Sequence, residues 1–136
     1  MSGSLKIEIV TPEGVIFSED ALLVGLPALD GAIGVRPHHV RLMTQIVPGE
    51  ITDRTSRGDR YLAVGERLVE VTADRVTVVT DMAVAVDKID EAKAEASRER
   101  AAARLRDKIS DEEVASVNVS LARSLAQLRV KRRHRA

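Results

Sequence analysis

The sequence predicts a β-sandwich in residues 1–86 followed by an antiparallel two-helix hairpin in residues 87–136. Before Asp87, short apolar runs alternate with turn residues, and residues 5–10 have the period of two that is typical of a half-buried strand. From Asp87 onward there is no glycine and no proline, and alanine and charged residues recur at helical spacing. One change of period in a chain of 136 residues indicates two modules.

The first module is predicted to consist of short strands separated by turn signals. Residues 5–10 end at the segment TPEG (11–14), where proline pre-sets the backbone angle of a turn. The segment 31–34 (GAIG) lies in a loop rich in glycine and proline, and we interpret it as a tight turn. β-Branched runs with frequent turns favour a sandwich. The other expected strands are 15–17, 21–26, 43–47, 51–55, 61–64, 68–71, 76–80 and 82–86.

The second module is predicted to begin with Asp87 as the N-cap of a first helix, with Asp90 in its first turn. Charge pairs at i,i+3, Asp90–Lys93 and Glu95–Arg98, support this helix. The segment SDEE (110–113) has the pattern of a capping box, so a second helix is expected to start there.

The expected apolar faces of the two helices are unequal. The first is built mostly from alanine, which buries little area, and isolated helices of this length are marginal in water. We therefore expect the hairpin to depend on the sandwich or on a partner, and to be movable. The first face comprises Ile89, Ala92, Ala96, Ala103, Leu105 and Ile109, and the second comprises Val114, Val117, Leu121, Leu125 and Leu128.

Composition narrows the class of protein further. Phe17 and Tyr61 are the only aromatic residues, so the core must be aliphatic, and the absence of cysteine fits a reducing compartment. No apolar stretch is long enough to span a bilayer and the N-terminus lacks the pattern of a signal peptide, so we expect a cytoplasmic protein.

The two modules carry opposite net charge. Residues 1–86 carry 8 basic and 12 acidic residues, whereas residues 87–136 carry 13 basic and 9 acidic residues. Two oppositely charged modules can dock on each other, or the basic module can bind an acidic partner.

The sequence offers no constellation for catalysis. His38 and His39 are adjacent in a loop, where two side chains rarely reach one metal, so no metal site is expected. The segment 31–34 lacks the spacing of a phosphate-binding loop, and no serine or threonine shows a nucleophile signature. We therefore predict a chain without an active site of its own.

The basic tail, residues 129–135, leaves an alternative open. Polybasic segments bind nucleic acids through phosphate contacts, which would make the chain a nucleic-acid-binding adaptor. Single-strand binders usually offer stacking aromatics, and two aromatics are few for that purpose. A helix end that is solvated or binds a protein partner is therefore the favoured interpretation.

Four segments in order resemble the epsilon subunit of F-type ATP synthases, called delta in mitochondria. The first is GAIGVRPHHVRLMT (31–44) with the later PGEI (48–51), in which His39 falls on the histidine of the family signature. The others are residues 69–84, which resemble the last strands before the helices, 89–94 (IDEAKA), and 121–130 at the end of the second helix. The resemblance covers almost the whole chain.

This resemblance implies a non-catalytic rotor subunit, peripheral on the cytoplasmic face of the bacterial inner membrane. It would couple ion translocation to ATP synthesis. The sandwich would contact the gamma subunit and the c-ring, and the expected contact residues are Ala32, Arg36, His38, His39 and Arg41. Here Ala32 stands where the family often has an acid, and His38, Val40 and Arg41 replace glycine, alanine and proline, which suggests an altered rotor contact.

The hairpin is expected to fold on the sandwich, or to extend along gamma into the alpha and beta subunits and restrain ATP hydrolysis. The expected contacts with an acidic surface of the beta subunit are Arg129, Lys131, Arg132, Arg133 and Arg135.

The resemblance also implies a regulatory ATP site in some members. Its positions here are Ile89, Asp90, Lys93, Ala94 and Arg123. Lys93 replaces an arginine, and Gln127 stands where ATP-binding members tend to have another. Since lysine cannot supply a bidentate fork to phosphate, we expect weak ATP binding or none, and no required cofactor.

Overall fold

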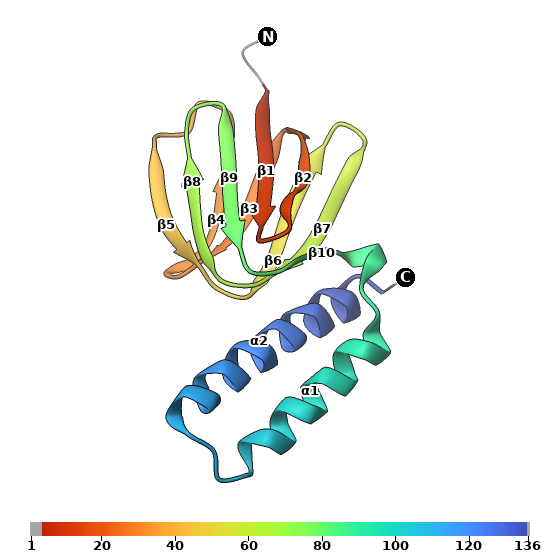
Figure 1. The fold of residues 1–136 in the computed structure, drawn as a ribbon. Helices are drawn as coiled ribbons and strands as arrows, with labels where there is room; N and C mark the ends of the chain where they lie inside the picture. Colours follow the sequence, from red (N-terminus) through yellow and green to blue (C-terminus); the bar gives the residue numbers. More distant parts are fainter. Residues whose placement is uncertain (1–3, 136) are drawn as a thin grey trace.

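The computed structural model describes residues 4–135 and shows a β-sandwich with a helical hairpin against one of its ends (Figure 1). The fold class predicted from the sequence is confirmed. The strands are β1 (Leu5–Thr11), β2 (Gly14–Ala21), β3 (Leu23–Ala28), β4 (Gly31–Val35), β5 (Leu42–Ile46), β6 (Gly49–Thr55), β7 (Gly58–Val64), β8 (Arg67–Val71), β9 (Arg75–Thr80) and β10 (Ala83–Ala85).

The strands form one hydrogen-bonded path that folds into two layers. Its order is β10-β7-β6-β3-β5-β8-β9-β1-β2, with β4 paired to β3. The path bends between β3 and β5, where a single residue pair, Ala28 with Ile46, joins the two layers. Pairing is antiparallel except between β1 and β9, which are parallel. A β-bulge at Ile9/Val10 bends the pairing of β1 with β2.

The core of the sandwich is aliphatic, as the composition requires. Inward-facing residues alternate along β1, where Leu5, Ile7 and Ile9 are fully buried, and along β9, where Val76 and Val78 are. The same cluster takes in side chains of β3, β6, β7 and β8, so both layers contribute to it.

The interpretation of residues 31–34 as a tight turn was wrong. They belong to β4, which pairs antiparallel with β3 from Val24↔Val35 to Ala28↔Gly31. The turn lies just before, at Leu29 and Asp30, and Gly31 takes the positive φ of 128° that closes it. The glycines suggested a loop, but the hydrogen bonds that β3 offers decide the structure.

The entry into the hairpin also differs from the prediction. Asp87 lies in a short 3₁₀ turn, η1 (Val86–Lys88), and does not cap the helix. Asp90 is the N-cap of α1 (Glu91–Leu105), and its Oδ1 accepts a hydrogen bond from the backbone N–H of Lys93 at 3.0 Å. The second predicted start is confirmed, because Ser110 Oγ caps α2 (Asp111–Arg133) by accepting from the N–H of Glu113.

The buried faces of the helices are only partly those predicted. In α1, Ala94 and Ala101 are buried, whereas Ala92 and Ala103 are exposed. In α2, Leu128 is buried as expected but Leu125 is 38% exposed. The other buried residues of α2 are Ser124, Ala126 and Val130. The reason is that α2 lies between α1 and the sandwich, so two surfaces are buried and not one stripe (Figure 1).

Candidate functional site

The hairpin is attached to the sandwich by a small apolar cluster. Ala63 on β7, Ile89 after η1 and Val130 on α2 are buried together. Tyr61, Val84 and Val86 pack against them. This cluster is separate from the sandwich core, and few apolar groups take part in it, so the hairpin is held by a modest hydrophobic contribution.

Polar contacts at the C-terminal end of α2 add to this cluster. His134 Nε2 lies 2.6 Å from Glu50 Oε1 on β6, and the imidazole stacks on Tyr61 with ring centroids 3.6 Å apart. Arg133 lies 3.7 Å from the other oxygen of Glu50, and Lys131 Nζ donates to the carbonyl of Val86 at 3.2 Å. Within residues 131–134, Lys131, Arg133 and His134 therefore each contact the sandwich or η1.

A second polar contact lies nearer the middle of α2. Arg123 Nε is 3.1 Å from Asp81 Oδ2, in an ion pair between α2 and the segment before β10. Asp81 lies against Gly65, where a Cβ would come within 1.8 Å of Asp81 Oδ1. Only glycine at position 65 lets Asp81 take the place from which it pairs with Arg123. Gln127 also faces this segment, with Nε2 3.7 Å from Met82 Sδ.

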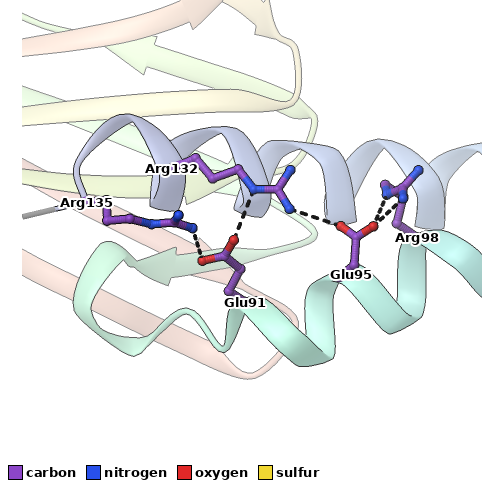
Figure 2. A network of polar contacts seen from close by, with 5 residues as sticks. All are labelled: Glu91, Glu95, Arg98, Arg132 and Arg135. Carbon is purple, nitrogen blue, oxygen red and sulfur yellow. Dashed lines mark hydrogen bonds and ion pairs between the residues drawn. The ribbon is translucent and has the colours of Figure 1, made fainter.

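The two helices are joined to each other by a chain of charged residues, shown in Figure 2. Glu91 on α1 pairs with Arg132 at 3.0 Å and with Arg135, and Glu95 pairs with Arg132 at 3.2 Å and with Arg98. Hydrogen bonds from Arg135 and Arg132 lower the pKa of Glu91, and that from Arg98 lowers the pKa of Glu95. Because both pKa values lie below those of an unfolded chain, these contacts support the hairpin above the unfolded pKa and are lost as acidification passes the folded value.

A pocket of about 330 Å³ opens between η1, α1 and α2. Of the predicted nucleotide positions, Asp90, Lys93 and Ala94 line it, while Ile89 is buried in the apolar cluster and Arg123 is paired with Asp81. Lys88 also lines this pocket, although no pattern in the sequence pointed to it, because it lies in a 3₁₀ turn three residues before Glu91. The full lining is Val84, Lys88, Asp90, Lys93, Ala94, Ser97, Ser124 and Gln127.

This pocket has a limited capacity for phosphate. The carboxylate of Asp90 is engaged in capping α1, and the cationic groups in the lining are the two ammonium groups of Lys88 and Lys93. An ammonium acts on phosphate as a point charge and does not form the paired hydrogen bonds of a guanidinium.

The predicted rotor-contact residues lie at two ends of the sandwich. His38 donates its backbone N–H to Ala73 in the β8–β9 turn, which places the loop of Arg36, His38, His39 and Arg41 at the end opposite the hairpin. Ala32 is exposed near the start of β4, next to the turn that closes on Gln45, at the other end of the strand. The structure therefore does not bring these five positions together as one patch.

Most of the basic tail is engaged within the chain. Arg132 and Arg135 bind α1, and Lys131 and Arg133 bind η1 and β6, while Arg129 is exposed on α2. The folded hairpin therefore neutralises much of the charge that the tail would offer to a partner. Within residues 4–135 no three metal-binding side chains gather at one point, and no helix there is both long and apolar enough to span a membrane.

A β-sandwich that carries a helical hairpin on a small, largely polar interface defines a protein of two modules. Residues 4–86 match the beta-sandwich domain of the ATP synthase Delta/Epsilon chain family, and residues 87–132 match its long alpha-helix domain. The chain belongs to this family, as an epsilon chain of ATP synthase.

Similar proteins agree with this assignment. The ATP synthase epsilon chain of Chloroflexus aggregans is 39% identical over 132 residues, covering 96% of this chain and 94% of its own. That of Herpetosiphon aurantiacus is 35% identical over 126 residues, covering 93% of both. A chain in the mitochondrial ATP synthase structure of Euglena gracilis, which contains OSCP, F1 and the c-ring, has the same fold with a TM-score of 0.71 at 18% identity, covering 88% of this chain and 76% of that one. The nucleic-acid alternative finds no support.

Proposed function

We propose that this chain couples rotation to ATP synthesis in the central stalk and restrains ATP hydrolysis when its hairpin leaves the sandwich. The observation that carries the proposal is the attachment of the hairpin: one small apolar cluster and a few ion pairs hold it. Two packings of one element can exchange when they differ by only a few kcal/mol. An interface of this kind keeps the difference small.

The same contacts support the proposed partners. Release of the hairpin from the sandwich would free the cations of Lys131 and Arg133, and separation of its two helices would free those of Arg132 and Arg135. The freed cations could then meet an acidic surface on the beta subunit. The sandwich would remain on the gamma subunit and the c-ring, at the cytoplasmic face of the bacterial inner membrane. The chain would act without an active site of its own.

Removing residues 88–136 tests the inhibitory role directly. The sandwich core is separate from the hairpin cluster, so the shortened chain is expected to fold and to form a complex with a co-expressed gamma subunit. The assembled enzyme should then hydrolyse ATP severalfold faster than with the full chain, in a steady-state assay. Unchanged hydrolysis would remove the inhibitory role, and failure of the full chain to bind gamma would contradict the coupling role.

We also propose that ATP is not a required cofactor and binds the pocket of Lys88 and Lys93 at most weakly. Exchanging Lys93→Arg supplies a bidentate donor, and we expect it to raise ATP affinity about tenfold in titration calorimetry. The matched Lys93→Gln exchange should remove the binding. Equal affinities in the three chains would show that ATP does not use this pocket.

A further inference from the structure

His134 connects the end of the hairpin to both neighbouring strands of the sandwich. It is the C-cap residue of α2, its side chain is 19% exposed, and its partner Glu50 is 15% exposed. The ring is held on one side by the stack on Tyr61 of β7, at an interplanar angle of 14°, and at its edge by Glu50 of β6. A titratable ring is thus part-buried in the contact that fastens the hairpin.

The strength of this contact depends on the charge of the ring. An ionised carboxylate only accepts hydrogen bonds, so Nε2 of His134 must carry the hydrogen that points to Glu50. The neutral ring can do this with Nδ1 unprotonated, and a proton added at Nδ1 turns the same contact into an ion pair. Charge-assisted hydrogen bonds are roughly twice as strong as neutral ones, and histidine changes charge between pH 5 and 8.

Charged and polar groups from α2, β6, β7 and η1 lie around the ring. Glu50 also faces Arg133, and the hydroxyl of Tyr61 donates to Asp59 at 3.4 Å. On the side of η1, the turn carries Asp87 and Lys88, and Lys131 binds its backbone. Histidine is the residue type in this group whose ordinary pKa lies near neutral pH. The imidazole is therefore the group that makes this junction sensitive to protons.

We propose that His134, Glu50 and Tyr61 form a protonation-sensitive latch, which holds the hairpin on the sandwich more tightly at mildly acidic than at mildly alkaline pH. The latch deepens the proposed function, because it sets how readily the hairpin is released. It is a property of the isolated chain, so it can fail while the inhibitory role stands, and the inhibitory role can fail while the latch stands.

The chain contains no cysteine, which allows a direct test. Val130→Cys places a single thiol in the buried cluster, where Val130 is 2% exposed, so a thiol reagent can label it only after the hairpin leaves. The matched chain carries Val130→Cys with His134→Gln, whose amide can donate to Glu50 but does not titrate. Dividing the two labelling rates removes the intrinsic pH dependence of the thiol.

Between pH 6 and pH 8.5, protection of the thiol in the His134 chain should fall about fivefold to tenfold relative to the His134→Gln chain. Glu50→Gln should abolish this dependence, and His38→Gln with His39→Gln should preserve it. The latch would be overturned if thiol protection changed with pH in the same way with and without His134. Loss of the pH dependence in the variant that lacks His38 and His39 would also overturn it.

If the His134→Gln chain is labelled fast at every pH, its hairpin is undocked and it cannot serve as the reference. A second measurement then tests the latch. In the unsubstituted chain, the NMR resonances of the Tyr61 ring and of the α2 amides near Val130 should follow the titration of the His134 ring. Resonances that stay constant through that titration would overturn the proposal.

Discussion

Replacing Asp53 by asparagine is expected to stabilise the protein by about 3–5 kcal/mol at pH 8 while changing its stability little at pH 4. Asp53 lies on β6 and is fully buried, and neither carboxylate oxygen receives a hydrogen bond from residues 4–135. The neighbouring Glu19 on β2 is in turn paired with Arg60 at 3.4 Å. A buried carboxylate without donors beside a second acid is costly when charged.

The sign of the effect follows from the pKa of Asp53. Burial first, and then the adjacent Glu19, raise this pKa to about 8, although Arg60 acts in the opposite direction. An unfolded chain releases the proton near pH 4, so between about pH 4 and pH 8 the native state binds a proton that the unfolded state does not. The contribution of Asp53 to stability therefore falls as the pH rises through this window and is constant above it. Asparagine keeps the shape, stays neutral, and can donate to Glu19.

Urea unfolding of both chains at pH 4, 5, 6, 7 and 8 measures this difference. Its control is Asp20→Asn, which removes an exposed carboxylate from strand β2 and should give a small difference that does not grow with pH. The interpretation would be contradicted if the difference in unfolding free energy for Asp53→Asn were as independent of pH as that of the control. A loss of stability at pH 8 would contradict it as well.

The fold could be predicted wherever the local pattern and the tertiary contacts agree. Strands such as β1 and β9 show the alternation of buried residues that one covered face imposes. The strand β4 could not be found, because glycine at 31 and 34 weakens the strand signal and the partner β3 supplies the stabilisation. Asp87 and Asp90 are equivalent as caps in the sequence, and the 3₁₀ turn that buries Ile89 selects Asp90.

The candidate site was predicted only where it is local. Asp90, Lys93 and Ala94 fall within one helical turn and line one pocket. The contact between Glu50 and His134 joins positions 84 residues apart, and no periodicity in the sequence predicts such a pair. One signal was present, since His134 is the one histidine among the arginines of the tail. Asp53 resembles any polar residue of a half-exposed strand until the position of β2 shows that it is buried.

Introducing a charge at Val130 is expected to release the hairpin while leaving the sandwich folded. In the Val130→Asp chain a carboxylate would replace a side chain that is 2% exposed and packed on Ala63 and Ile89. Burying an unpaired charge there would cost about 3–5 kcal/mol, whereas the free energy that attaches the hairpin to the sandwich is small. The docked population should fall more than about 100-fold. Helices of this length are marginal on their own, so the helical signal should fall as well.

Hydrogen exchange read residue by residue separates the two modules in this variant. Amides of α1 and α2 should lose their protection, while those of β1, β8 and β9, which belong to the other cluster, should keep it. Leu125→Asp is the matched control, because it places the same charge on the same helix at a position that is 38% exposed. Protection lost throughout the sandwich in Val130→Asp would mean that the two modules fold as one unit. Such a unit could not release its hairpin without unfolding, so this outcome would also exclude the movement on which regulation by the hairpin depends.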